Sequence, residues 1–296
     1  MISIIIPTYN NSIRLIQTIR NVLSQNNVIM ELIIIDDSST DNTKKQILLI
    51  QDERIKYYYN SKNIGTTNSR IVGIKKAQGE YIAFIDDDDD WMDNKLYKQK
   101  IILDAKPYDF VTCNYTINDE INKNIYNKNI NHYCEKFTVN ILQAPGPFLQ
   151  CCLFKKNFLL NNLDGFDKKA EPSEDWDFFI TISKLKPQIA HISEFLFQWN
   201  LSISSQSSNL QNEAAALDYI INKHAFYILA ETSARNLSFQ FRKLGHMYFK
   251  LRNKNKSVFY YYKAKKIYPY SIKNWIFILF NYLPISCQGF LIKRMI

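Results

Sequence analysis

The sequence has little of what would support several common kinds of site. Its five cysteines are odd in number and show no CxxC spacing, which argues against a disulfide framework and against a cysteine-bound metal. Its four histidines are scattered, so we assign none of them to a metal. No basic and apolar signal sequence precedes the first apolar run at Ile2, and we therefore expect a chain that stays in a reducing cytoplasm.

Acidic residues are missing from the end of the chain. After Glu231 the sequence has 13 Lys and Arg and no Asp or Glu, whereas residues 1–205 have 23 Lys and Arg against 25 Asp and Glu, a net charge of −2. The overall net charge of +9 therefore arises beyond residue 205. Such one-sided charge suggests an anionic partner, either a membrane surface or nucleic acid. Because no nucleic-acid-binding motif accompanies it, we favour a membrane surface and expect no nucleic acid.

Short apolar runs alternate with helical patterns through the first 90 residues. The runs are too short for helices and suit strands buried on both faces. They cover residues 2–6, 32–35, 55–59 and 81–85. The predicted helices between them cover residues 12–23, 42–50 and 65–77. We expect Asn11 or Ser12 to cap the first helix, whose apolar face would carry Ile13, Ile16, Ile19, Val22 and Leu23. Three alternations predict an α/β fold with a parallel sheet covered on both sides.

Polar or turn-forming residues follow each predicted strand, at the sheet edge where open parallel sheets bind ligands. They are Pro7, Thr8, Tyr9, Asn10, Asp37, Asn63, Gly65 and Arg70, with residues 86–90 after the fourth strand. A nucleoside diphosphate suits this set, because Tyr9 offers a ring face to a base, Asp37 could accept the imide N–H of uracil, and Arg70 could meet phosphate or base oxygens. Each residue alone could instead serve a turn or a helix cap, and we expect this of Asp36 or Asp41.

Five consecutive aspartates, residues 86–90, form the most unusual stretch of the chain. Adjacent negative charges repel strongly, so a folded protein that keeps them must supply a cation or admit water. Two carboxylates one residue apart can both face one Mg2+ or Mn2+ ion and leave coordination positions open for phosphate oxygens. The alternative is a solvated acidic loop, which is the commoner role of a charge run. The apolar residues 82–85 and Trp91 on either side favour the metal site.

The second half of the chain offers one further acidic cluster. We expect a helix at 94–103, a strand at 109–115, and a long polar loop on the acceptor side at 117–136. Glu174 and Asp175 lie in the first turn of a predicted helix, where the helix dipole favours ionised carboxylates. Simple helix capping is the alternative for these acids.

Beyond residue 205 the pattern is helical. Residues 206–266 read as helices. Leu244, Gly245, Tyr248, Ala264 and Pro269 loosely resemble one tetratricopeptide unit, which would need to pack on the catalytic domain or on a partner. The apolar run from Trp275 to Leu283 is followed by Pro284, which makes it poor as a membrane-spanning helix. It suits a helix lying in the membrane interface, and a buried C-terminal helix with a basic face is the alternative.

Five blocks in one order carry a specific resemblance. They are residues 4–10, 31–41, 63–70, 79–89 and 173–177. Together they resemble the inverting glycosyltransferases of family 2 across residues 1–205. The resemblance implies the GT-A fold, which is α/β and Rossmann-like, with a mostly parallel central sheet flanked by helices. It divides the chain into a nucleotide-sugar-binding half at 1–90, an acceptor-side half at 91–205, and a basic helical C-terminal region at 206–296.

The resemblance also implies roles for single residues. Residues 86–88 would be the DxD motif, in which Asp88 is the main ligand of Mn2+ or Mg2+ and Asp86 lies nearer the ribose or the water shell of the metal. Asp175 would be the catalytic base. Beside it, we expect Glu174 to orient Asp175 or to meet the acceptor. The nucleotide-sugar-binding set would be Pro7, Thr8, Tyr9, Asn10, Asp37, Asn63, Gly65, Arg70, Asp86 and Asp87. One departure is Ile71, where many relatives have Asn.

The function that these expectations favour is inverting transfer of a hexose or N-acetylhexosamine from a UDP-sugar. The acceptor would be a hydroxyl of a glycan or an undecaprenyl-diphosphate-linked glycan, in bacterial O-antigen, capsule or lipooligosaccharide synthesis. The basic C-terminal region would hold the enzyme at the inner face of the cell membrane. A nucleotidyltransferase could use the same paired carboxylates, but residues 7–10 are not the Gly-rich loop that it would need. A basic nucleic-acid-binding module is the non-enzymatic alternative.

Overall fold

The computed structural model describes residues 1–146, 148–202 and 209–280, and it divides into two compact units. The first unit comprises residues 1–168 and 174–205, and the second comprises residues 169–173 together with the chain from 206 onward. The short segment 169–173 therefore belongs with the C-terminal helices, although it precedes the helix that carries Asp175.

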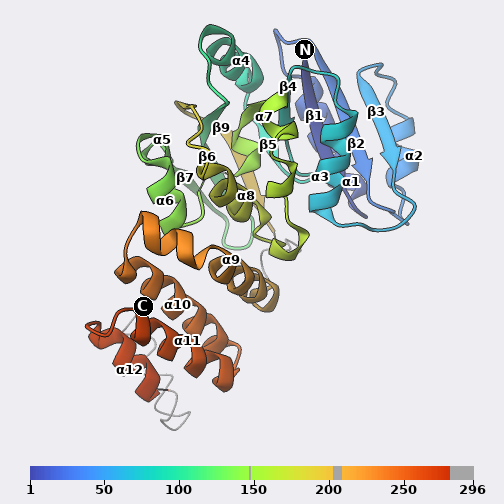
Figure 1. Ribbon diagram of the computed structural model, residues 1–296. Coiled ribbons are helices and arrows are strands. Elements are labelled where there is room, and N and C mark those ends of the chain that lie inside the picture. The colour runs from blue at the N-terminus through green and yellow to red at the C-terminus, as the bar shows by residue number, and fades with distance from the viewer. Residues whose placement is uncertain (147, 203–208, 281–296) are drawn as a thin grey trace. The chain divides into compact units, whose positions relative to one another are not determined.

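The first four strands of the first unit form a parallel sheet in the order β3-β2-β1-β4 (Figure 1). Their bounds are β1 Ile2–Thr8, β2 Met30–Asp36, β3 Ile55–Tyr59 and β4 Tyr81–Phe84. Every residue of β1, β2 and β4 is buried, as expected for near-continuous apolar runs covered on both faces. The parallel sheet predicted from the alternation is confirmed. Because these strands run in parallel, the polar loops that follow them lie at the same edge of the sheet.

The remaining strands make the sheet mixed. They are β5 Asp90–Trp91, β6 Phe110–Asp119, β7 Asn124–Lys128, β8 Leu153–Lys155 and β9 Ile189–Leu201. The sheet continues from β4 through antiparallel β8 to β6, β9 and β5, and β7 pairs with β6. The expectation of a long loop at 117–136 is therefore wrong in part, because its first half is a β-hairpin. All five residues of β7 are exposed, so no apolar alternation marked this strand.

Helices cover the sheet and position its loops. In the first unit they are α1 Ser12–Leu23, α2 Thr43–Leu48, α3 Thr66–Lys76, α4 Lys95–Ala105, α5 His132–Glu135, α6 Phe137–Gln143, α7 Lys156–Leu160 and α8 Glu174–Ser183. Asn11 occupies the expected N-cap position of α1, but its side chain makes no capping hydrogen bond: it donates to Asp87 instead, and the Ser12 amide donates to Asp41 Oδ2 at 3.2 Å. Ile13 is 79% exposed, because α1 buries the face that carries Leu15, Ile19 and Val22.

An aromatic core fixes the start of α8 against the sheet. The Phe166 and Phe178 rings stack with centroids 4.3 Å apart, and Phe178 packs edge-on to Phe154 of β8 at 6.1 Å. The ring centroid of Phe179 lies 6.0 Å from that of Phe110 of β6. Buried aromatic pairs of this kind stabilise by area and by ring geometry. These contacts pack the N-terminal half of α8 against β8 and β6.

The second unit contains α9 Leu210–Glu231, α10 Ala234–Lys250, α11 Lys254–Ile267 and α12 Ile272–Phe280, shown from orange to red in Figure 1. Gly245 lets α10 and α11 approach closely, since a Cβ there would lie 2.8 Å from the Tyr261 ring. Asp218 of α9 accepts hydrogen bonds from the hydroxyls of Tyr248 and Tyr260, which join the three longer helices.

Within the described part of the chain, none of the helices combines the length and the apolar content needed to cross a bilayer. The predicted interfacial segment is described as α12 up to Phe280. Its continuation from 281, including Pro284, lies outside the described residues.

Candidate active site

Arg70 joins the acidic loop after β4 to the first turn of α8. Its Nη2 lies 2.8 Å from Asp86 Oδ1, and its Nη1 lies 2.5 Å from Glu174 Oε1 and 3.4 Å from Asp175 Oδ1. Arg70 is 2% exposed. Burial alone would lower the pKa of Arg70, but the three carboxylates raise it above its ordinary value. The cation is therefore permanent, and it brings together residues that the sequence analysis found in separate blocks.

The contacts of Arg70 differ from those expected. We expected Arg70 to meet phosphate or base oxygens, whereas its described partners are three carboxylates from α8 and the acidic loop. A guanidinium presents its donors in a fixed fork, so one side chain can hold Asp86 on one arm and Asp175 on the other. The arrangement fixes the separation between the expected donor motif and the expected base.

Asp175 has the environment of a general base. Its Oδ2 accepts a hydrogen bond from the Leu149 amide at 3.0 Å, and 17% of its side chain is exposed. Burial raises the pKa of Asp175 to about 7, with Arg70 lowering it and Glu174 raising it. A base with a pKa near the working pH combines a large ionised fraction with useful proton affinity. Burial also raises the pKa of Glu174, against the opposing effect of Arg70.

Gln150 holds the second oxygen of Asp86, although it was not among the expected site residues. Its Nε2 donates to Asp86 Oδ2, while its backbone carbonyl oxygen accepts from Trp91 Nε1 at 3.1 Å. Gln150 lies in the 3-10 turn Leu149–Cys151, whose first amide holds Asp175. Asp86 and Asp175 are therefore tied twice, once through Arg70 and once through this turn. No local sequence pattern indicates this role of Gln150, because its partner Asp86 lies 64 residues earlier in the chain.

Asp87 joins the loop after β1 to the acidic loop. Its Oδ2 accepts from Thr8 Oγ1 at 2.5 Å, and its Oδ1 accepts from Asn11 Nδ2 at 2.8 Å. Burial raises the pKa of Asp87 to about 7, although both hydrogen bonds lower it. Asp87 was expected to bind the nucleotide sugar, and the structure commits both of its oxygens to holding Thr8 and Asn11.

The last two aspartates of the run are tied to β9 through Asn200. The Asn200 amide donates to Asp89 Oδ1 at 2.9 Å, and its side chain donates to Asp90 Oδ2 at 2.9 Å. Asp88 lies between Asp87 and Asp89, which are both anchored, and no side chain of the described chain bonds its carboxylate. Burial, followed by the charge of Asp86, raises the pKa of Asp88 to about 6. Asp88 is thus the carboxylate of the run that is left for a ligand.

These carboxylates fit a divalent ion that takes most of its ligands from the substrate. Among the described residues no group of three or more His, Cys, Asp or Glu could hold a metal on its own. Mg2+ is commonly bound through one or two carboxylates, with phosphates and waters completing its shell. Asp88 suits that role by its hard oxygen and its neighbouring negative charge. Asp86, which we also expected as a ligand, has its oxygens engaged by Arg70 and Gln150.

Asp37 shapes the loop that leads into α3. Its Oδ1 accepts from Asn60 Nδ2 and from the Ile64 amide, both at 2.9 Å, and its Oδ2 accepts from the Gly65 amide at 2.8 Å. Gly65 has φ 91°, a conformation that favours glycine. The expected contact between Asp37 and uracil stays a prediction. Asp36 bonds the Ser39 amide and the Tyr57 hydroxyl, which confirms its turn role.

The other expected nucleotide-binding residues lie along the same sheet edge. Pro7 is buried within β1, whereas Tyr9 and Asn63 are exposed. Asn10 has φ 52°, and its Oδ1 accepts from the Thr40 amide at 2.8 Å, which joins the loops after β1 and β2. The structure therefore leaves the Tyr9 ring and the Asn63 side chain open to a ligand at this edge.

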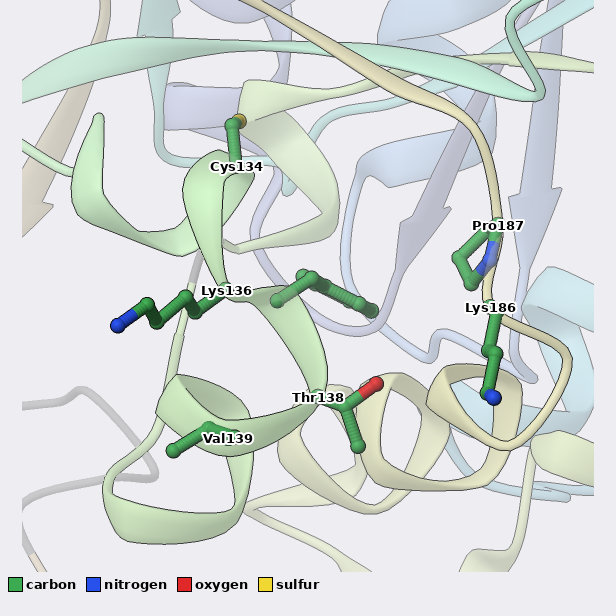
Figure 2. Close-up of a pocket in the computed structure, with 7 residues that line it drawn as sticks. Cys134, Lys136, Thr138, Val139, Lys186 and Pro187 are labelled. Atoms are coloured by element: carbon green, nitrogen blue, oxygen red, sulfur yellow. The ribbon is translucent and has the colours of Figure 1, made fainter.

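A separate pocket lies between α6 and the turn after α8, and Figure 2 shows its lining side chains. They belong to two segments, 134–139 and 186–187. Its charged members are two lysines, Lys136 and Lys186, and it contains none of the expected site residues. We assign no chemistry to this pocket.

Residues 3–159 match the sequence profile described as glycosyl transferase family 2. The chain is 31% identical over 187 residues to an uncharacterised glycosyltransferase of Rickettsia bellii, and the match covers 62% of this chain and 26% of that protein. It is 32% identical over 117 residues to WfgD of Escherichia coli, named as a UDP-Glc:alpha-D-GlcNAc-diphosphoundecaprenol beta-1,3-glucosyltransferase, covering 40% of this chain and 46% of WfgD.

The fold is similar to solved GT-A glycosyltransferases. TarS 1–349 of S. aureus, in complex with UDP-GlcNAc, aligns with a TM-score of 0.66 at 16% identity, covering 90% of this chain and 81% of that one. A mannosyltransferase from Pyrobaculum calidifontis, in complex with GDP-Man and Mn2+, aligns with a TM-score of 0.58 at 15% identity, covering 94% and 78%. The GT-A fold expected from the sequence is confirmed.

Proposed function

Because this chain belongs to glycosyl transferase family 2, we propose that it transfers a hexose or N-acetylhexosamine from a UDP-sugar to a hydroxyl of a glycan, with inversion at the anomeric carbon. The observation that carries this proposal is the double link between Asp86 and Asp175, through Arg70 and through the turn that holds Gln150. A donor bound at the acidic loop then lies beside a single partly exposed base.

The reaction needs one base and one leaving-group site. Asp175 takes the proton of the acceptor hydroxyl as its oxygen attacks the anomeric carbon, and the bond from that carbon to the diphosphate oxygen breaks, with its electron pair leaving on UDP. Attack opposite the leaving group inverts the configuration. Glu174 and Arg70 keep Asp175 in place, and the Leu149 amide fixes the orientation of its carboxylate.

Asp88 would hold Mg2+ or Mn2+, which supplies positive charge to the diphosphate as negative charge develops on it. The Tyr9 ring would stack on the nucleobase of the donor. Asp37 would hold the loop that carries Asn63. The mannosyltransferase with bound Mn2+ and TarS with bound UDP-GlcNAc support a metal and a UDP-sugar by their likeness in fold.

The acceptor is proposed to be a lipid-linked glycan of bacterial surface polysaccharide synthesis. The name of WfgD gives an undecaprenyl-diphosphate-linked acceptor for that relative. A lipid-linked acceptor is confined to the bilayer, so the enzyme would work peripherally at the inner face of the cell membrane. The matched part of the chain spans 26% of the length of the Rickettsia bellii protein and 46% of that of WfgD. The donor sugar and the linkage are therefore also part of this proposal.

A donor screen tests the function. Purified protein with Mn2+ and a lipid-mimetic acceptor should release UDP from at least one of UDP-glucose, UDP-galactose and their N-acetylated forms, and the acceptor should gain one sugar of inverted configuration. Absence of UDP release from the whole panel would contradict the proposal. Release of pyrophosphate from a nucleoside triphosphate would instead indicate nucleotidyl transfer.

A further inference from the structure

One face of α12 is fixed toward the interior of the second unit. Asn274 is fully buried, and its Nδ2 donates to Ser238 Oγ at 2.9 Å and to the Tyr268 carbonyl at 3.0 Å. Ile278, four residues later, is also buried. Residues four apart share a helix face, so these two side chains define the face that packs on α10 and α11.

The other face of α12 carries an exposed apolar stripe. Ile272, Trp275 and Leu279 follow i, i+3, i+7 spacing, which places them on one side of the helix. They are 74%, 49% and 66% exposed. Three large apolar side chains on one exposed face form a surface whose removal from water lowers the free energy.

Basic side chains border this stripe. Lys265 Nζ of α11 lies 3.4 Å from the Trp275 ring centroid and 5.7 Å from that of Tyr262, which is also exposed. The exposed Lys266 and Lys273 are close to it in sequence, and no Asp or Glu follows Glu231 in the chain. We call the side chains of Tyr262, Lys265, Ile272, Trp275 and Leu279 the aromatic–basic face.

We propose that the aromatic–basic face binds the headgroup region of an anionic lipid bilayer. Aromatic rings and lysines are the side chains favoured at that depth, and the aliphatic Ile272 and Leu279 suit the acyl boundary. Lysines near an anionic surface are attracted to its phosphates, and the end of the chain has no acidic residue to oppose them. The inference adds a contact surface to the proposed function and rests on it only for the presence of a membrane.

Vesicle flotation with the full chain tests this inference. Phosphatidylcholine vesicles containing phosphatidylglycerol should carry the protein upward at low salt, whereas phosphatidylcholine alone should carry far less. Raising the salt concentration should release it, because exposed charges are screened. Trp275→Glu combined with Leu279→Glu should reduce the bound fraction ~tenfold or more, since two apolar contacts are replaced by repelled charges. Lys265→Gln combined with Lys266→Gln should lower binding without adding negative charge.

Controls separate this inference from its alternatives. Ile29→Glu combined with Leu49→Glu changes two exposed apolar residues of the first unit and should leave flotation unchanged. Equal loss in this control, or no flotation of the wild type, would overturn the proposal. So would flotation that appears only after truncation behind Phe280, which would mean that residues 281–296 cover the face. UDP release is measured in the same samples. A protein that releases UDP but does not bind the vesicles would contradict the lipid contact and leave the proposed function standing.

Discussion

A single buried cation organises the acidic residues of the site. Arg70 is enclosed by three carboxylates, and each of them is also partly removed from water. Removing one member of a buried charge group costs about 3–5 kcal/mol, because the remaining charges are left unpaired. The same geometry that stabilises this group keeps Asp86 and the proposed base Asp175 at a fixed separation.

Asp175→Asn tests the base assignment. Asparagine keeps an oxygen for the Leu149 amide but cannot accept the acceptor proton at neutral pH. We expect the transfer rate to fall by about 10²–10⁴, while calorimetry gives a UDP affinity near that of the wild type. Substantial turnover by this variant would show that another group is the base.

The pH dependence of kcat/KM tests the environment of Asp175. The folded protein raises the pKa of Asp175 to about 7, and only the ionised form can accept a proton. The rate should therefore rise with pH along a one-proton limb centred near pH 7, and level off above it. A limb centred near pH 4, the ordinary range of an aspartate, would contradict the proposed environment.

Gln150→Met tests the second link to Asp86. Methionine is similar in size but cannot donate to Asp86 Oδ2. We expect the donor KM to rise and kcat/KM to fall by about tenfold, the equivalent of one charge-assisted hydrogen bond. Gln25→Met is the matched control, because Gln25 is another buried glutamine, and its side chain bonds the Met92 carbonyl and the Leu96 amide instead of an expected site residue. If both variants lose activity equally, Gln150 acts only through stability.

At the scale of elements, the loop before α3 depends on one glycine. Gly65 has φ 91° and ψ 160°, a region that residues with a Cβ rarely adopt, and its amide bonds Asp37. Gly65→Ala should lower the unfolding free energy by about 1–3 kcal/mol, measured by urea denaturation. Thr66→Ala, one residue later at the start of α3, should cost less. An equal loss of unfolding free energy in the two variants would show that the backbone conformation at Gly65 does not require glycine.

The sequence predicted elements well where burial is continuous. The isoleucine runs of β1 and β2 and the apolar run of β4 gave the parallel half of the sheet. The hairpin of β6 and β7 was missed because β7 is exposed and polar, and Ile13 was misplaced because α1 turns Leu15 and Thr18 inward instead.

The site was predicted only as far as local patterns reach. Runs of carboxylates at 86–90 and 174–175 were visible as such, and Arg70 stood in a recognisable block. The pairing of Arg70 with Glu174, 104 residues later, could not be read from spacing. The same holds for Gln150 and for Asn200, which holds Asp89 across 111 residues. Contacts of that sequence separation are set by the sheet order, in which β8 and β9 were not foreseen.

At the scale of the whole molecule, charge and chemistry are divided along the chain. The acidic site lies within residues 1–205, which carry a net charge of −2 and of which residues 3–159 match the family 2 profile, and the excess of basic residues lies beyond residue 205. Such a division suits an enzyme whose donor needs a cation to bind at an acidic loop and whose acceptor is held at an anionic surface.

The binding of UDP with and without a divalent ion tests the central claim, that Asp88 holds a metal which the nucleotide completes. Titration calorimetry with Mn2+ should give a UDP affinity at least about tenfold higher than with EDTA, since a phosphate-bridging cation is lost. Asp88→Asn should show the weak affinity under both conditions. A wild-type affinity that is indifferent to EDTA, or an Asp88→Asn variant that keeps the full metal effect, would contradict the account.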